Sequence, residues 1–244
     1  MRERRSKAYN KKARKRRNKT LIKSNFKPGL NELYKLMQSR FGFLNWWPGD
    51  TKFEIFVGAI LTQQTSWSNV AKVIQRLKDN NLLNLNAIID IDQNKLEELI
   101  KPSGYYRQKS KRLKEICNII KANYGDLNRL FELDKIKLRN TLLNLKGVGK
   151  ETADSIILYA AEKPIFVIDA YTKRIMHRIY NIPEDISYDI LQNYFESELK
   201  KDLILYKDMH AQFVELGKTY CRKKPECNEC PLKIYCKYEN QNKQ

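Results

Sequence analysis

Asp169 is the acidic residue whose setting points most directly to chemistry. It follows the apolar run Phe166-Val167-Ile168 and precedes a segment, 170–180, with the apolar spacing of a helix. A carboxylate in this position can cap the helix. Beside a carbon that becomes positively charged, it can also stabilise that charge and orient or deprotonate an attacking water. The apolar neighbours would raise its pKa and the helix N-terminus would lower it, so the sequence leaves the direction of the shift open.

A second group of residues is typical of phosphate binding: the turn at 145–150, which reads Leu-Lys-Gly-Val-Gly-Lys. Gly147 and Gly149 allow positive φ, and without a Cβ they let a phosphate or another backbone come close. The helix expected after the turn would direct its free N–H groups and the positive end of its dipole at an anion, and Lys146 adds charge. The pattern predicts a phosphate-binding hairpin of Gly147, Val148, Gly149 and Lys150, although an ordinary helix–helix connection can have the same composition.

Four cysteines near the C-terminus, separated by five, two and five residues, form the most specific pattern for metal binding: Cys221, Cys227, Cys230 and Cys236. Four thiolates can hold an iron–sulfur cluster or Zn(II), and four cysteines can also form two disulfides. Nothing in the sequence indicates an oxidising compartment, which speaks against disulfides. Zinc sites usually have two Cys-x2-Cys pairs, and here there is one. Cys117 stands apart on an amphipathic segment and is predicted to be a core residue.

Two further stretches place polar and aromatic side chains at the ends of apolar helices. The segment 53–62 is so apolar that it predicts a central buried helix, and Gln63 and Gln64 follow it directly. In the segment 102–107, Pro and Gly impose a turn with Tyr105 at its tip, and basic residues beginning with Arg107 come next. Each stretch also has a simpler interpretation: Gln63 and Gln64 can be just a polar helix end, and the aromatic residues of 102–107 can pack under their own loop.

Charge is strongly unbalanced along the chain. The 244 residues carry a net charge of +19, of which residues 1–23 contribute +11. This N-terminal tail is too polar to fold and predicts a disordered segment, 1–25, that binds a polyanion or acts as a nuclear-import signal. No apolar run reaches the roughly 20 residues that cross a bilayer, and there is no signal-peptide core. An intracellular, monomeric protein without a membrane partner is expected.

Almost every segment after residue 26 has helical periodicity, and no convincing strand pattern occurs. The fold class predicted is therefore all-α. Helices are expected near 30–41, 53–62, 70–77, 96–100, 113–124, 138–143, 170–180, 188–200 and 206–220. His177 and His210 lie on such helices without ligand partners at a useful spacing, so both are predicted to be structural.

The two-glycine hairpin, followed about twenty residues later by an isolated Asp, resembles the helix-hairpin-helix DNA glycosylases, the superfamily of endonuclease III. The resemblance implies that the hairpin grips the DNA backbone and that Asp169 serves the sugar carbon of an extruded nucleotide. It also implies that Gln64 enters the space left by the extruded base and that Tyr105 wedges into the base stack. Base–aromatic stacking is worth about 1–3 kcal/mol, which would offset part of the unstacking cost.

The cysteine loop resembles the iron–sulfur loop of endonuclease III and adenine glycosylase, where four Cys bind a [4Fe–4S] cluster. It departs from that pattern by one residue, since the first gap there has six residues and this one has five. Zinc is the main alternative. The cluster's role would be to stiffen a basic loop, with Lys223 among its residues, against DNA phosphates.

One family residue is missing from this chain. Bifunctional members carry a lysine two residues after the second hairpin glycine, which forms a Schiff base and cleaves the strand; here that residue is Glu151. The departure favours a monofunctional glycosylase. Glu151, together with Trp46, Trp47 and Trp67, also resembles the 3-methyladenine DNA glycosylase III branch, which removes alkylated purines, and these four are the expected base pocket. Simple burial is the alternative for the tryptophans, and that branch typically lacks the iron–sulfur cysteines.

The resemblance implies two helical domains with a DNA-binding cleft between them. One would be a helical barrel of residues 45–164 that ends in the hairpin, and the other would combine 26–44 with 165–244. The expected function is excision of damaged bases from double-stranded DNA by base flipping and hydrolysis of the N-glycosidic bond. Two alternatives are a glycosylase/lyase acting on oxidised pyrimidines and a non-catalytic DNA-binding module.

Overall fold

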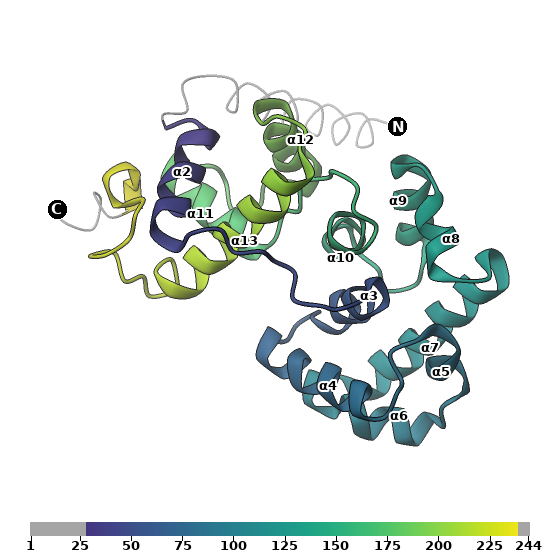
Figure 1. Cartoon of the computed structure of the whole chain (residues 1–244). Coiled ribbons are helices and arrows are strands. Elements are labelled where there is room, and N and C mark those ends of the chain that lie inside the picture. The colour runs from purple at the N-terminus through teal and green to yellow at the C-terminus, as the bar shows by residue number, and fades with distance from the viewer. Residues whose placement is uncertain (1–27, 239–244) are drawn as a thin grey trace, which may run out of the picture. The chain divides into compact units, whose positions relative to one another are not determined.

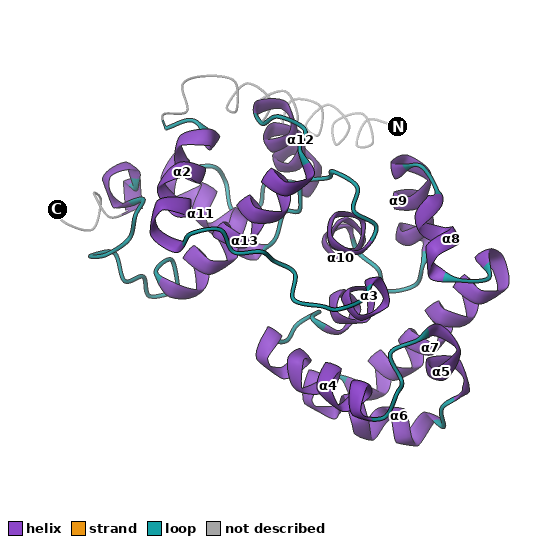
Figure 2. Cartoon of the chain, in the orientation of Figure 1, coloured by secondary structure: helices purple, strands orange, loops and turns teal. Residues whose placement is uncertain are grey.

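The computed structural model of the chain describes residues 28–238 (Figure 1). Within this range all regular structure is helical (Figure 2), which confirms the predicted all-α class. The tail predicted to be disordered, 1–25, lies outside the described residues. No helix among those described is long and apolar enough to span a membrane.

The chain divides into two compact units. The middle unit is Trp47–Ile165, and the split unit combines the residues up to Trp46 with those from Phe166 onward. These boundaries fall two residues and one residue after the expected ones at 44/45 and 164/165. The predicted DNA-binding cleft stays a prediction.

The middle unit is organised around α3 (Lys52–Leu61). Seven of its ten residues are buried, as the apolar run predicted, and Thr51 caps it by accepting a hydrogen bond from the Glu54 N–H. Around α3 lie α10 (Lys150–Ser155), η2 (Ile156–Ala160), α4 (Trp67–Asp79) and α7 (Tyr106–Tyr124). The unit is completed by α5 (Leu85–Asp90), α6 (Gln93–Ile100), η1 (Lys101–Ser103), α8 (Leu127–Glu132) and α9 (Lys135–Asn144).

Three elements of the middle unit were not predicted. Helices α5 and α8 have six residues each, too few turns for periodicity to show, although Asn84 and Asp126 are recognisable N-caps. The third is η2, a π-helical turn in which the Ala161 N–H donates to the Ile156 carbonyl at 2.9 Å. Its residues are apolar throughout and give no sequence signal for the wider turn.

The split unit contains α2 (Leu30–Phe41), α11 (Ala170–Tyr180), α12 (Tyr188–Glu198), α13 (Leu203–Thr219) and the short η3 (Lys233–Tyr235). Helix α13 packs against both α2 and α11. Its core includes a cluster of aromatic rings: Phe166 stacks on Phe195 at 4.2 Å between centroids, and Tyr206 and Phe213 contact these rings edge-on. Because Phe166 belongs to the segment that leads into α11, this cluster fixes the chain three residues before Asp169.

Candidate active site

Asp169 is the N-cap of α11, as the simpler interpretation of the sequence expected. Its Oδ1 accepts two hydrogen bonds from Thr172, one from the backbone N–H at 2.7 Å and one from the hydroxyl at 2.8 Å. Its Oδ2 takes no part in the cap and faces His210, whose Nε2 is 3.6 Å away. The two carboxylate oxygens therefore have separate environments, one structural and one beside an ionisable ring.

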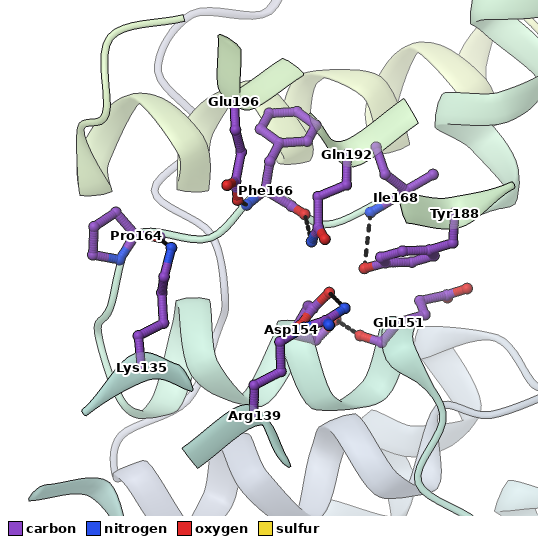
Figure 3. A network of polar contacts seen from close by, with 11 residues as sticks. Lys135, Arg139, Glu151, Asp154, Pro164, Phe166, Ile168, Tyr188, Gln192 and Glu196 are labelled. Carbon is purple, nitrogen blue, oxygen red and sulfur yellow. Dashed lines mark hydrogen bonds and ion pairs between the residues drawn. The ribbon is translucent and has the colours of Figure 1, made fainter. Parts of the chain in front are cut away.

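The segment in front of Asp169 is held by side chains of α12 (Figure 3). Glu196 accepts from the Phe166 N–H at 2.9 Å, and the Gln192 amide donates to the Phe166 carbonyl at 2.7 Å. The Ile168 N–H donates to the Tyr188 hydroxyl at 3.3 Å. An extended segment without a sheet partner needs such bonds for its backbone groups. They leave the carboxylate of Asp169 little freedom to move.

His210 has a neighbour that the sequence did not indicate. It was predicted to be structural, a prediction that stays open, and it lies on α13 against Asp169, with both side chains buried at 6% and 9% exposure. The sequence places the two residues 41 positions apart on separate helices, so only the packing of α11 on α13 brings them together. His177, the other histidine, bonds through Nδ1 to the Ile182 carbonyl at 2.6 Å, which agrees with a structural role.

The pKa of Asp169 lies below its ordinary value. Burial of the side chain raises it, but the His210 ring and the two donors of Thr172 act in the opposite direction and outweigh the burial. This answers the question that the sequence left open. A carboxyl with a lowered pKa is ionised at neutral pH, the state in which it can stabilise positive charge.

Trp46 stacks on the ring of His210, with centroids 6.1 Å apart and planes at 28°, and the Lys218 ammonium lies 5.0 Å from the centre of its ring. The segment that carries Trp46 is fixed by α13. The buried Asp208 accepts from the Leu44 N–H at 2.9 Å, and Gln212 donates to the Gly42 carbonyl at 2.6 Å. Helix α13 thus positions both His210 and the aromatic ring against it.

The hairpin of the middle unit joins α9 to α10, with the Val148 N–H donating to the Leu145 carbonyl at 3.1 Å. Gly147 has φ +82°, a conformation that other residues adopt only with strain, so glycine is favoured there, and a Cβ would also displace the flexible end of Arg112, 2.1 Å away. Gly149 differs from the expectation: its φ is −87°, within reach of any residue, while a Cβ there would meet open space. Only Gly147 uses the backbone freedom that was predicted for both.

Gln63 ties this hairpin to the end of α3. Its amide donates to the Gly147 carbonyl at 3.0 Å and to the Thr152 hydroxyl at 3.1 Å. Val148 buries its side chain in the unit, so only its backbone can meet a ligand, whereas Lys150 is exposed. Helix α10 is held by Arg139 of α9, which donates two hydrogen bonds to the buried Asp154, at 2.6 and 3.0 Å (Figure 3).

Gln64 and Tyr105 share an uncommon geometry. Both are exposed, and both have left-handed backbones, with φ of 56° and 45°. A non-glycine residue in this region has a conformational cost, and such residues concentrate at sites where a side chain must be presented. Tyr105, 67% exposed, is not packed under its loop, so the simpler interpretation of this residue does not hold. Arg107, on the first turn of α7, is also largely exposed and lies 3.9 Å from Glu97.

The four residues expected to line a base pocket are divided between the two units, three in the middle unit and one in the split unit. Trp47 and Trp67 meet edge to face at 5.2 Å in the middle unit, over Gly58 and beside Tyr159 of η2. Trp46 belongs to the split unit. Glu151 is exposed on the first turn of α10, where its backbone carbonyl accepts from the Ser155 hydroxyl at 2.7 Å.

The four C-terminal cysteines line one small cavity together with Arg178 and Tyr220, and none of them forms a disulfide. Arg178 donates to the Cys221 sulfur at 3.1 Å and to the Arg222 carbonyl at 2.7 Å, and to the carbonyl of Lys223, whose side chain is exposed. In residues 28–238, no group of three or more Cys, His, Asp or Glu side chains is gathered closely enough to hold a metal ion. Cys117 is fully buried, which confirms its prediction as a core residue.

Comparisons with known proteins identify the family. Residues 57–201 match the sequence profile of the HhH-GPD superfamily of base excision DNA repair proteins. The chain belongs to this superfamily. It is 48% identical over 207 residues to a Methanocaldococcus jannaschii protein with the provisional name DNA repair glycosylase, a match that covers 84% of this chain and 94% of the relative. The predicted resemblance is thereby confirmed.

Two solved structures of the superfamily are similar to this one. The H. pylori 3-methyladenine DNA glycosylase, solved with 1,N6-ethenoadenine, has a TM-score of 0.69 at 31% identity and covers 78% of this chain and 97% of its own. An endonuclease III–DNA complex has a TM-score of 0.76 at 22% identity, covers 88% and 96%, and shows the shared fold. The protein is a DNA N-glycosylase of base-excision repair.

Proposed function

We propose that this HhH-GPD glycosylase hydrolyses the N-glycosidic bond of a flipped, damaged nucleotide, with Asp169 as the catalytic carboxylate. The observation that carries the proposal is that the two carboxylate oxygens of Asp169 have different contacts. Oδ1 accepts hydrogen bonds from Thr172, and the buried Oδ2 faces His210. The middle unit would bind the DNA backbone through residues 147–150 of the hairpin. Arg107 and Lys223 would contribute further phosphate contacts.

Departure of the base leaves positive charge on the anomeric carbon of the sugar. An ionised carboxylate beside that carbon stabilises the charge, far better where water is excluded than in bulk solvent. Oδ2 is the oxygen available for this task, or for accepting a proton from the attacking water. His210 would act as a positioning residue that holds Oδ2 in place and favours its ionised form.

The reaction would stop at base removal. Residue 151, where bifunctional relatives have the Schiff-base lysine, is glutamate, and its neighbour Lys150 lies about 100° around the helix from it. An amine at position 150 would therefore point in a different direction from one at 151. Borohydride trapping on a lesion duplex should give little covalent adduct, and efficient trapping would favour the glycosylase/lyase alternative on oxidised pyrimidines.

Alkylated purines are the proposed substrate class. The 31% identity to the H. pylori 3-methyladenine DNA glycosylase supports this choice, as do the tryptophans of the expected pocket. Alkylation gives purines a cationic ring, which stacks well on electron-rich aromatic faces. In this proposal Trp47 and Trp67 supply such faces, and Glu151 adds a negative charge at the pocket.

The C-terminal loop is proposed to hold a [4Fe–4S] cluster on Cys221, Cys227, Cys230 and Cys236. Four cysteines that line one cavity supply the thiolate donors that such clusters take. Zn(II) is the alternative, since it also accepts four thiolates, but the four sulfurs would have to move closer together to bind a single ion. Iron, sulfide and zinc analysis of the purified protein should give iron and sulfide with visible absorption. A colourless protein containing stoichiometric zinc would overturn this assignment.

The decisive experiment replaces Asp169 with asparagine, which keeps the cap and the shape but removes the charge. Excision should fall by about 10³-fold or more, the scale on which preorganised charge and acid–base catalysis contribute, while duplex affinity is retained. Both proteins should be assayed on a panel of alkylated, oxidised, uracil-containing and mismatched duplexes. An Asn variant that cleaves normally would remove Asp169 from the mechanism, and the panel reports the substrate class directly.

A further inference from the structure

Lys109 is a buried lysine whose ammonium bonds to backbone carbonyls and to no carboxylate among the described residues. It lies on the first turn of α7 with 4% exposure, and its ammonium donates to two backbone carbonyls, those of Leu61 at 2.9 Å and Ser103 at 2.6 Å. Burial lowers its pKa to about 8, and the nearby Arg112 acts in the same direction. Burying a charge costs free energy unless hydrogen bonds replace the lost contacts with water, and the two carbonyls supply such bonds to Lys109.

The two carbonyls belong to the two segments that present Gln64 and Tyr105. Leu61 ends α3, three residues before Gln64, and Ser103 ends η1, two residues before Tyr105. A helix end leaves carbonyls without intrahelical partners, and a cation there is stabilised by the helix dipole. One ammonium thus satisfies backbone groups from both segments, which are otherwise about forty residues apart in sequence.

Both presented residues need support of this kind. Each is exposed and has a left-handed backbone, a conformation that persists only when the surrounding structure enforces it. Gly104, between Ser103 and Tyr105, has φ +68°, so the loop contains two consecutive residues with positive φ. Without the bonds to Lys109, these two turns would sample other conformations, and the distance between the Gln64 and Tyr105 side chains would vary.

We propose that Lys109 is a positioning residue that fixes Gln64 and Tyr105 relative to each other, so that both enter the DNA together when the damaged nucleotide leaves the stack. The inference rests on the proposed function and on the family resemblance, which implies that these two residues enter the DNA. It adds a residue that touches neither DNA nor substrate. Its effect should be confined to the step that opens the duplex and should spare the cleavage step at Asp169.

A matched control exists on the same helix. Lys114 also donates from its ammonium to a single backbone carbonyl, that of Ile91, away from both segments. Lys109→Met and Lys114→Met each remove one ammonium and one set of lysine–carbonyl bonds from α7. A general loss of helix packing would affect the two variants alike, whereas the proposed role would affect only the first.

The test uses the full-length protein and a duplex with 2-aminopurine opposite a tetrahydrofuran abasic analogue, where unstacking raises the fluorescence. We expect Lys109→Met to lose at least roughly half of the rise at saturating protein, and Lys114→Met to keep it. Excision by Lys109→Met should fall roughly tenfold on a fully paired lesion but less than about twofold on a lesion opposite an abasic site, where little stacking resists extrusion. Lys109→Arg should restore part of both signals.

The outcomes separate this proposal from the proposed function. A wild-type protein that releases no base from any duplex would refute the function, while the fluorescence measurement would still report on Lys109. A full fluorescence rise and full paired-duplex excision in Lys109→Met would overturn the positioning role. So would equal losses on paired and unpaired lesions. If circular dichroism shows that the Met variant does not fold, Lys109→Gln, whose shorter side chain cannot span both carbonyls, carries the same expectation, and a full rise would refute it.

Discussion

The surroundings of Asp169 and those of the exposed residues Gln64 and Tyr105 are built in opposite ways. Asp169 is buried, and most of its bonds come from Thr172, three residues further along the same helix. Gln64 and Tyr105 are exposed, and Lys109 bonds to the segments of both, one 48 residues away at Leu61 and the other only six residues away at Ser103. A reactive carboxylate gains from low water content, whereas a residue that enters DNA must reach solvent. A cap within its own helix can therefore hold Asp169, whereas Gln64 and Tyr105 depend on a buried side chain that joins their two segments.

The strongest remaining test of the Asp169 site is His210→Gln. Because His210 contacts Oδ2 from another helix, we expect its loss to lower kcat about 10- to 100-fold while changing KM little, through misplacement of the carboxylate. Single-turnover excision at saturating protein measures this directly. The control is His177→Gln, which alters the other histidine in the same unit and should leave kcat within about twofold.

If His210→Gln lowered only the affinity for DNA, the ring would be a binding residue and the comparison between the two regions would weaken. If His177→Gln had the same effect as His210→Gln, a general disturbance of the split unit would be responsible. Circular dichroism of both variants should show unchanged helix content.

Gln63→Ala tests the hydrogen bonds that connect α3 to the hairpin in the middle unit. Gln63 connects the end of α3 to the hairpin at Gly147 and to Thr152, so its loss should loosen the hairpin and weaken DNA binding about five- to tenfold. The rate of excision from bound DNA should change little, because Asp169 is not involved. Fluorescence anisotropy at fixed salt gives the affinity, and Gln75→Ala, which removes an exposed Gln–Asp79 bond, is the control.

The same contrast explains which parts of the molecule the sequence could predict. Long amphipathic helices, the buried α3 and the cap at Asp169 depend on neighbours within a few residues, and periodicity and capping rules describe such neighbours well. Gly147 was predictable as a turn glycine for the same reason. The six-residue helices α5 and α8 fall below the length at which periodicity is visible.

His210 and Lys109 were beyond sequence reasoning for a different reason. Each lies on an ordinary helical stretch. His210 contacts Asp169, 41 residues away, and Lys109 contacts Leu61, 48 residues away, and only tertiary packing brings such residues together. A histidine or lysine on a helix is most often a surface residue, so its type alone gives no signal. Asp169 was predictable from a motif and Tyr105 from its turn, while the buried residues that contact their segments, His210 and Lys109, were not.

Thr172→Val should have the smallest effect and tests the local half of the comparison. Valine keeps the shape of threonine but removes the hydroxyl donor to Oδ1, while the backbone N–H of residue 172 still bonds to Asp169. The pKa of Asp169, which is lowered in the folded chain partly by this hydroxyl, should therefore rise. A group with a lowered folded-state pKa stabilises the fold above its unfolded pKa of about 3.9 and loses that contribution as pH falls through the folded value. The variant should consequently lose about 1–2 kcal/mol of unfolding free energy at pH 7, and the difference from wild type should shrink toward pH 3.

Urea titrations at pH 7, 5 and 3 measure the loss of unfolding free energy and its dependence on pH. Excision at pH 7 should fall only about two- to fivefold, because the carboxylate stays ionised there. A loss of stability that was the same at every pH would mean that the hydroxyl acts through packing alone, and the local support of Asp169 would then rest on the backbone N–H.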